Sequence, residues 1–133
     1  MGSQVAVITG GAQGIGKQTA HVLNDLGWSL VLLDLQEVDV SIYRDATSLV
    51  GDITSEVFVQ SAVDATMTRF GRVDALVNNA GISCISAALD TPADLYRKVI
   101  DVNLVAPFLL AKAFGKVMID AGCGAVVNVA SVA

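Results

Sequence analysis

The feature that most constrains this chain is a group of glycines between an apolar run and a helical pattern. Residues 5–9 are rich in β-branched side chains, and glycines follow at positions 10, 11, 14 and 16. From residue 14 to residue 26 apolar side chains recur at helical spacing, and Gly27 follows them. Glycines at a strand-to-helix turn let the backbone approach a ligand, and the N–H groups that begin a helix attract an anion. The pattern predicts a phosphate-binding loop, with close packing of the turn as the alternative.

The same alternation of strands and helices continues along the chain. Further strands are expected at residues 28–33, 47–50, 73–78 and 125–129, and further helices at residues 54–70 and 91–121. Thr54 or Ser55 can cap the helix at residues 54–70, and Gly71 stands where it is expected to stop. The last helix has strong start signals, because Thr91 suits the N-cap, Pro92 the first helical position and Asp94 the third. Residues 36–46 are weakly patterned, which indicates a loop or a short helix. This order of elements predicts an α/β fold with a doubly wound parallel sheet, the Rossmann fold.

Composition limits the partners that such a chain can have. Hydrophobic residues make up 53% of the 133 residues, charged residues make up 16%, and the net charge is −5. This balance excludes intrinsic disorder and is typical of strands buried on both faces of a sheet. An acidic chain without a basic cluster is a poor partner for nucleic acid or an anionic membrane. The run at residues 104–111 contains Pro107, and no uninterrupted apolar run reaches the ~20 residues of a membrane span.

The two cysteines, Cys84 and Cys123, lie far apart, and neither belongs to a metal-ligand motif. Free thiols in a reducing compartment are therefore expected, and no metal site. The N-terminus has no secretory signal pattern. Together these features predict a cytoplasmic protein.

The spacing of the glycines narrows the choice of phosphate ligand. Positions 10, 14 and 16 give GxxxGxG instead of the GxGxxG of many dinucleotide-binding loops. Residues 11–17 also match most of a P-loop, but Gln18 stands where a hydroxyl must bind Mg²⁺. Because an amide there removes a metal ligand, a nucleoside triphosphatase is the less favoured alternative.

Asp34, at the end of the second expected strand, indicates which dinucleotide is bound. An acid at that place accepts hydrogen bonds from the adenosine ribose hydroxyls. A 2′-phosphate would face this carboxylate, and the next residue, Leu35, offers no positive charge. The sequence favours NAD over NADP, unless Asp34 does no more than end a strand.

Four stretches together resemble the short-chain dehydrogenase/reductase family. They are TGxxxGxG at residues 9–16, Asn78-Asn79-Ala80-Gly81 after the fourth strand, Asp101-Val102-Asn103 in the long helix, and Val127-Asn128-Val129-Ala130-Ser131 at the fifth strand. The resemblance covers essentially all 133 residues. It implies the strand order 3-2-1-4-5 and an oxidoreductase that transfers a hydride between a nicotinamide cofactor and a small-molecule alcohol or ketone.

The resemblance also implies a role for each matching residue. For the cofactor, Gly10, Gln13, Gly14, Ile15 and Gly16 would line the pyrophosphate and ribose, Asp34 would hold the adenosine ribose, Asp52 and Ile53 would contact the adenine, and Asn79, Ala80 and Gly81 would run under the cofactor. Asn78 would brace the fourth strand. In catalysis, Ser131 would hydrogen-bond the substrate oxygen, and Asn103 would be the catalytic asparagine.

Asn103 also has a property that follows from the sequence itself. Pro107, four residues later, has no N–H, so the helical hydrogen bond to the carbonyl of Asn103 cannot form. A free carbonyl and a local kink are expected there. In the resembled family this carbonyl holds a water of the proton relay. A proline that only shapes packing is the alternative.

The resemblance also makes clear what these 133 residues lack. The acid/base tyrosine of the family lies in a YxxxK motif, but Tyr43 and Tyr96 are followed four residues later by Thr47 and Ile100. We therefore expect an NAD-binding domain, residues 1–133, that is incomplete at its C-terminus and inactive alone. Its fifth strand would be an open apolar edge, which later strands of the family would cover. The alternative is a non-catalytic dinucleotide-binding or interaction module.

The long helix at residues 94–121 is apolar over more than one face. One side is expected to pack on the sheet, and the resembled family pairs this helix across a dimer. The sequence thus predicts a homodimer or homotetramer that forms through this helix.

Overall fold

Five parallel strands form the centre of the molecule. The computed structural model describes residues 2–132, and its sheet has the order β3-β2-β1-β4-β5. The strands are β1 (Val5–Thr9), β2 (Ser29–Asp34), β3 (Ala46–Val50), β4 (Ala75–Asn78) and β5 (Ala125–Asn128). All neighbouring pairs are parallel. The expected α/β fold and strand order are confirmed.

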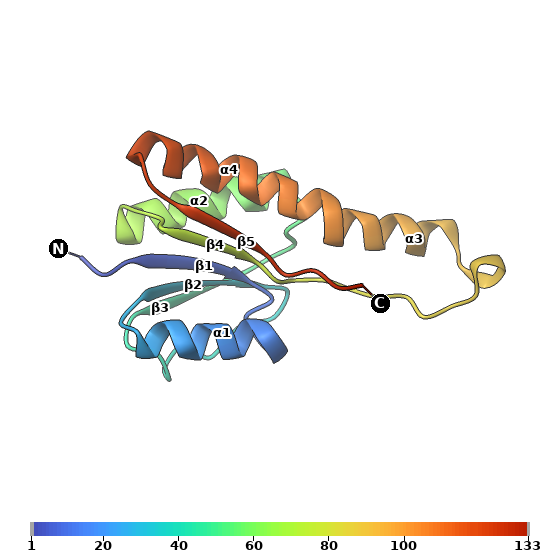
Figure 1. The fold of residues 1–133 in the computed structure, drawn as a ribbon, viewed down its shortest axis with the longest axis horizontal. Coiled ribbons are helices and arrows are strands. Elements are labelled where there is room, and N and C mark those ends of the chain that lie inside the picture. Colours follow the sequence, from blue (N-terminus) through green and yellow to red (C-terminus); the bar gives the residue numbers. More distant parts are fainter. Residues whose placement is uncertain (1, 133) are drawn as a thin grey trace.

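Helices cover both faces of the sheet. They are α1 (Gly14–Asp25), α2 (Glu56–Phe70), α3 (Ala93–Ile100) and α4 (Ala106–Ala121), with a 3₁₀ turn η1 (Ala88–Asp90) and a π-helical segment η2 (Asp101–Val105). In Figure 1, α1 lies on one face, α2 and α4 lie on the other, and α3 continues beyond the sheet. The stretch at residues 36–46, expected as a loop or a short helix, contains no helix.

The inner strands bury alternate residues in two separate cores. Val7 of β1 packs with Phe114 of α4 in one core, and Ile8 packs with Ala20 of α1 in the other. All four side chains are fully buried. Strands covered on both faces need apolar residues at successive positions, which accounts for the apolar composition.

The expected helix signals are correct for α2 and wrong for α3. Ser55 is the N-cap of α2, its hydroxyl accepts a backbone N–H of the first turn, and Gly71 ends the helix with a φ of 70°. Thr91, expected as the N-cap of α3, instead donates its hydroxyl to the carbonyl of Ala87. Pro92 is the N-cap, in an extended conformation and without a side-chain cap. Thr91 is extended as well, as residues before proline usually are, and it finds its partner in the preceding turn.

The segments α3, η2 and α4 form one continuous helix, Ala93–Ala121. The irregularity expected near Pro107 is the π-helical segment just before it, where the N–H of Ala106 donates to the carbonyl of Asp101. Single π-turns inside α-helices occur where the regular hydrogen-bond ladder is interrupted, often at functional sites. The expected interruption of the regular helix therefore takes the form of a π-turn that contains Asn103.

By length and composition alone, this helix is apolar enough to cross a membrane. It has 29 residues, and its most apolar window has a mean hydropathy of 1.6 and is 22% buried. The expectation that no segment could span a membrane was based on uninterrupted apolar runs, and for this helix it is wrong by length and composition. In the fold, however, Leu110, Phe114 and Met118 of α4 are buried in the core. The buried side of α4 is therefore part of the packing of the sheet.

β5 is one edge of the sheet. It pairs with β4 from Ala125 opposite Ala75 to Asn128 opposite Asn78. All four of its residues are exposed, and Val127 is exposed to 51%. Within residues 2–132 the fifth strand is thus an open apolar edge, as expected.

Candidate cofactor-binding site

The loop between β1 and α1 has two positions that only glycine can occupy. Gly10 has a φ of 69°, and a Cβ there would lie 2.9 Å from Nδ2 of Asn79. A Cβ on Gly16 would lie 2.2 Å from the carbonyl oxygen of Gly10. The first turn of α1 therefore packs directly on the loop, with no room for a side chain between them.

The N-terminus of α1 is not capped by any side chain of residues 2–132. Gln13 at the N-cap is extended and makes no side-chain hydrogen bond to the helix, and the first turn contains no acidic residue. A Cβ on Gly14, whose φ is 56°, would meet no atom within 4 Å. The first N–H groups and the positive end of the helix dipole thus face open space. This arrangement fits the diphosphate of a dinucleotide.

Asp34 is held against the same loop. Its Oδ2 accepts the N–H of Ala12 at 3.0 Å, and its Oδ1 accepts the N–H of Gln36 at 3.2 Å. A carboxylate has about four lone-pair positions, so it can still accept hydrogen bonds from ribose hydroxyls. The ribose acceptor expected from the sequence therefore lies beside the expected phosphate loop.

Thr9, the last residue of β1, joins the glycine loop to the turn after β4. Its hydroxyl oxygen accepts the N–H groups of Asn79 and Ala80 at 3.0 and 2.9 Å. Nδ2 of Asn79 donates in return to the carbonyl of Thr9 at 3.0 Å. This role of Thr9 was not expected from the sequence. The available signal was a hydroxyl that ends a buried strand directly before the glycines.

Asn78 connects β4 to two further elements. Its Nδ2 donates to Oδ1 of Asn128 at 2.9 Å and to the carbonyl of Pro107 at 3.4 Å. Asn78 is only 4% exposed, and its Oδ1 has no hydrogen-bond partner in the described part of the chain. The bracing role implied for Asn78 therefore extends to β5 and the start of α4. The contribution of Asn128 was not expected.

The side chain of Asn103 holds the chain that follows Gly81. Its Oδ1 accepts the N–H of Ile82 at 2.9 Å, and its Nδ2 donates to the carbonyl of Ile82 at 2.7 Å. A Cβ on Gly81 would lie 3.3 Å from Oδ1 of Asn103. An amide can satisfy the donor and the acceptor of one residue together. From the sequence only a role for the carbonyl of Asn103 was expected, and this side-chain contact was not.

Asp52 and Ile53, which the resemblance assigns to the adenine, follow β3. Oδ1 of Asp52 accepts the N–H and the hydroxyl of Thr54 at 2.9 and 2.7 Å. These two hydrogen bonds, first the one from the backbone, lower the pKa of the Asp52 carboxyl, and the charge of Lys98 lowers it further. Ile53 is 8% exposed and packs in the core with α2 and α4. Ile53 therefore presents little surface to a ligand.

The expected site residues gather at the carboxyl edge of the sheet, where open parallel sheets bind ligands. The glycine loop follows β1, Asp34 ends β2, Asp52 follows β3, Asn79 follows β4 and Ser131 follows β5. The glycine loop contacts both Asp34 and Asn79 directly. Asp52 and Ser131 follow the two outermost strands of the same edge. Asn103 reaches this region from η2 instead.

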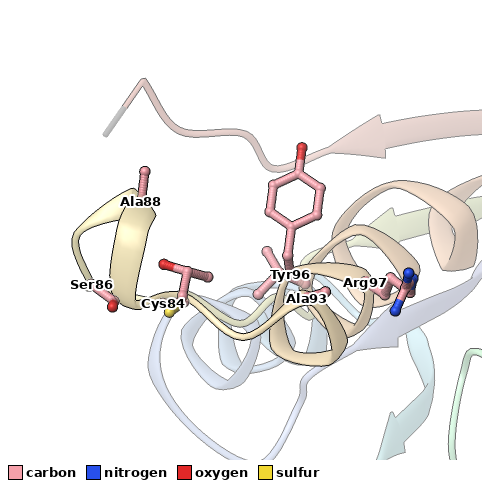
Figure 2. Close-up of a pocket in the computed structure, with 8 residues that line it drawn as sticks. Cys84, Ser86, Ala88, Ala93, Tyr96 and Arg97 are labelled. Atoms are coloured by element: carbon pink, nitrogen blue, oxygen red, sulfur yellow. The ribbon is translucent and has the colours of Figure 1, made fainter.

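An open pocket lies between the turn after Gly81 and α3 (Figure 2). Its volume is about 660 Å³, and the lining residues labelled in Figure 2 are Cys84, Ser86, Ala88, Ala93, Tyr96 and Arg97. Both cysteines are free thiols, as expected; Cys84 is half-buried and Cys123 is exposed. The pocket begins only a few residues beyond the turn that Thr9 and Asn103 hold.

The sheet order and the glycine loop define a Rossmann-type α/β protein. A family model described as short chain dehydrogenase matches residues 4–133. The chain therefore belongs to the short-chain dehydrogenase family. Membership of this family excludes the alternative of a P-loop nucleoside triphosphatase.

The relatives of the chain have names that indicate different activities. Momilactone A synthase of Oryza sativa subsp. japonica is 42% identical over 96% of this chain and 50% of that protein. An NAD-dependent glycerol dehydrogenase of Listeria innocua is 36% identical over 96% of this chain and 52% of that protein. A metagenomic short-chain oxidoreductase in complex with NADP has a TM-score of 0.90 and 32% identity, covering 99% of this chain and 64% of that one. The chain spans about half the length of the curated relatives it matches.

Proposed function

We propose that this chain is the NAD-binding part of an oxidoreductase that transfers a hydride between a nicotinamide cofactor and an alcohol or ketone. Membership of the short-chain dehydrogenase family supports the oxidoreductase class. The observation that carries the proposal is the contact between Asp34 and the glycine loop, because it sets a ribose acceptor beside an uncapped helix N-terminus. The adenosine and diphosphate parts of the cofactor both fit this arrangement.

Each part of the site has a distinct role in this proposal. The glycine loop and the N-terminus of α1 bind the diphosphate, and residues 79–81, the cofactor platform, run beneath the cofactor. The bound nicotinamide supplies the hydride chemistry. Ser131 orients the substrate oxygen, and Asn103 fixes Ile82 at the end of the platform. The acid/base group is not among residues 1–133, since neither Tyr43 nor Tyr96 belongs to a YxxxK motif.

The preference for NAD depends on the charge of Asp34. A 2′-phosphate within about 4 Å of the carboxylate would cost about 1–4 kcal/mol per unit charge. The NAD-dependent relative supports this preference, whereas the solved neighbour holds NADP. We base the proposal on the carboxylate of this chain, because it lies at the glycine loop itself.

Titration of the chain with NADH and NADPH tests the assignment of Asp34. We expect NADH to bind at least about tenfold more tightly, a difference of about 1.4 kcal/mol. Asp34→Asn removes the charge but keeps the shape, so it should bring the two affinities together by tightening NADPH binding. Asp64→Asn, which neutralises an exposed carboxylate on α2, is the matched control. An unchanged ratio of the two affinities in Asp34→Asn would contradict the assignment.

A non-catalytic dinucleotide-binding module is the second candidate. Residues 1–133 carry the expected cofactor-binding residues of both candidates and no YxxxK motif. NADH binding alone fits both candidates, so the protein as its gene encodes it must be assayed for NAD-dependent oxidation of secondary alcohols. Tight NADH binding without any turnover would support the module.

We also propose that residues 94–121 pair copies of this chain into a dimer or tetramer. Leu104, Phe108 and Ile119 are 65%, 63% and 79% exposed. Large exposed apolar side chains on one helix are typical of protein interfaces. Sedimentation should therefore detect an oligomer, and Phe108→Glu should shift it to the monomer. A monomer at micromolar concentration before the substitution would contradict the proposal.

A further inference from the structure

The pocket between the turn at residues 84–91 and α3 has a wall that suits one class of substrate. We propose that it binds the hydrocarbon body of a cyclic alcohol or ketone and excludes polyols. This inference rests on the proposed function, because it names the substrate class of the same site. Three observations carry it: the position of the pocket, its apolar wall and the pairing of its polar side chains.

The pocket adjoins the cofactor platform. Cys84, in its wall, is three residues beyond Gly81, and three residues span at most about 11 Å. Ile82, between them, is fixed by the two hydrogen bonds to Asn103, of 2.9 and 2.7 Å. A substrate whose reacting carbon lies over the platform would therefore extend into this pocket.

Much of the pocket wall is apolar. Ala88, Ala93 and Val99 line it with aliphatic groups, and Tyr96 adds a ring that is 62% exposed. Figure 2 shows the Tyr96 ring rising from α3, with the turn that carries Ala88 across the space from it. The volume of about 660 Å³ lies within the range of small-molecule sites, about 300–1,000 Å³. A rigid ring system buries apolar surface here without losing much conformational freedom.

Three polar side chains of the wall each have a hydrogen-bond partner within the protein. The hydroxyls of Ser86 and Thr91 donate to the carbonyl of Ala87 at 3.4 and 2.9 Å. Nη1 of Arg97 donates to Oδ1 of Asp94 at 2.9 Å, which uses one of the five N–H groups of the guanidinium. A polyol carries a hydroxyl on nearly every carbon, and each one that loses water without gaining a partner costs about 1–3 kcal/mol. Such hydroxyls find no partner against the aliphatic groups of Ala88, Ala93 and Val99, so this part of the wall disfavours polyols.

The Tyr96 hydroxyl is available to a ligand oxygen. Among the hydrogen bonds of residues 2–132, none involves this hydroxyl. In Figure 2 it points away from α3. This hydroxyl can bind a second oxygen of a cyclic substrate, one that lies far from the reacting carbon. The pocket would then select the orientation of the substrate as well as its chemical class.

Methyl NMR of the alanine-labelled chain, saturated with NADH, tests the inference. Decalin-2,6-dione is the cyclic probe, and erythritol is the polyol probe. We expect the dione to shift the methyl signals of Ala88 and Ala93 and to bind at least about tenfold more tightly than erythritol. Tyr96→Phe should weaken dione binding about fivefold, the effect of one hydrogen bond.

Two tryptophan variants separate the pocket from the rest of the helix. Ala93→Trp fills the pocket and should abolish dione binding, whereas Ala121→Trp, at the other end of the same helix, should leave it unchanged. Equal binding of erythritol and the dione, or an Ala93→Trp variant with unchanged dione affinity, overturns the inference.

If NADH leaves the amide signals of Gly10 and Gly16 unshifted, the proposed function is overturned instead. If those amide signals shift but the methyl signals of Ala88 and Ala93 do not shift when the dione is added, only the substrate inference is overturned.

Discussion

The N-termini of α1 and α2 lie at the same edge of the sheet but are built in opposite ways. α2 is capped by Ser55, whose hydroxyl accepts the N–H of Phe58 at 3.3 Å, and Glu56 stands in its first turn. α1 begins after Gln13, which makes no side-chain cap, and its first turn contains no acidic residue. α2 therefore satisfies part of its own N-terminus, whereas α1 leaves its first N–H groups to a ligand.

This difference separates a helix end that serves the fold from one that serves binding. A capping side chain stabilises a helix by about 0.5–2 kcal/mol. Without one, α1 forgoes that stability, and a bound diphosphate can restore it through the same N–H groups. Substitutions at α2 should therefore change stability, and substitutions at α1 should change cofactor affinity.

Gly16→Ala should have the largest effect. The new Cβ would lie 2.2 Å from the carbonyl oxygen of Gly10 and 2.5 Å from Nδ2 of Asn79, so the loop must move. We expect NADH affinity, measured by calorimetry, to fall at least about a hundredfold, or about 2.8 kcal/mol. Gly115→Ala in α4, where a Cβ meets no atom within 4 Å, should leave NADH binding unchanged. Full NADH affinity in Gly16→Ala would show that this loop is not the binding site.

A negative charge in the first turn of α1 should have the next largest effect. Ile15→Asp should weaken NADH binding about tenfold by repelling the diphosphate, while it stabilises the helix by about 0.3–1 kcal/mol. Ile15→Asn introduces a side chain with nearly the shape of aspartate but without its charge. The difference in NADH affinity between the two variants therefore measures the effect of the charge. Calorimetry gives the affinities and urea unfolding gives the stabilities. Equal NADH affinity in both variants would argue against a diphosphate at this helix end.

Ser55→Ala tests the N-terminus of α2, the capped helix end of the comparison. Losing the cap should lower the free energy of unfolding by about 1 kcal/mol, measured by urea unfolding, and leave NADH affinity unchanged. Ser55→Asp keeps an acceptor oxygen and should restore most of the stability. A loss of NADH affinity in Ser55→Ala would show that the two helix ends are not independent.

The smallest effect concerns acid sensitivity near the start of α2. Because the hydrogen bonds from Thr54 lower the pKa of Asp52 in the folded state, the ionised carboxylate stabilises the fold above its unfolded pKa of about 3.9. This contribution is lost as the pH falls through the lowered folded pKa. Urea unfolding of Asp52→Asn should therefore show a smaller loss of stability between about pH 5 and pH 2 than the unaltered chain.

Thr54→Ala is the companion variant for this measurement. It removes the hydroxyl donor to Asp52 and keeps the backbone donor, so it should reproduce part of the change. If Asp52→Asn has the same pH dependence as the unaltered chain, the Thr54 hydrogen bonds do not contribute to acid stability.

The fold could be predicted because its signals are local. Periodicity located every strand, and Ser55 and Gly71 marked the two ends of α2. The glycine spacing likewise marked the loop after β1. The start of α3 could not be predicted in this way, because Thr91 bonds to Ala87 in the turn before the helix.

The contacts within the site join residues that are far apart in the chain, so local signals could not reveal them. Thr9 meets Asn79 because β1 and β4 are neighbours in the sheet, and Asn128 meets Asn78 because of the register of β4 and β5. Asn103 meets Ile82 because η2 brings a helical side chain to the turn after β4. A search for polar side chains at the ends of neighbouring strands would have found the first two contacts.

The π-turn gives the long helix one place where its length can change. A π-turn closes over five residues instead of four, so it holds one residue more than an α-turn. Deleting one residue within Asp101–Val105 would convert it to regular α-helix and leave both flanks facing as before. Deleting one near the start of α4 would turn every later side chain by about 100° and carry Phe114 and Met118 away from the sheet. Length variation that spares the core is therefore confined to the segment around Asn103.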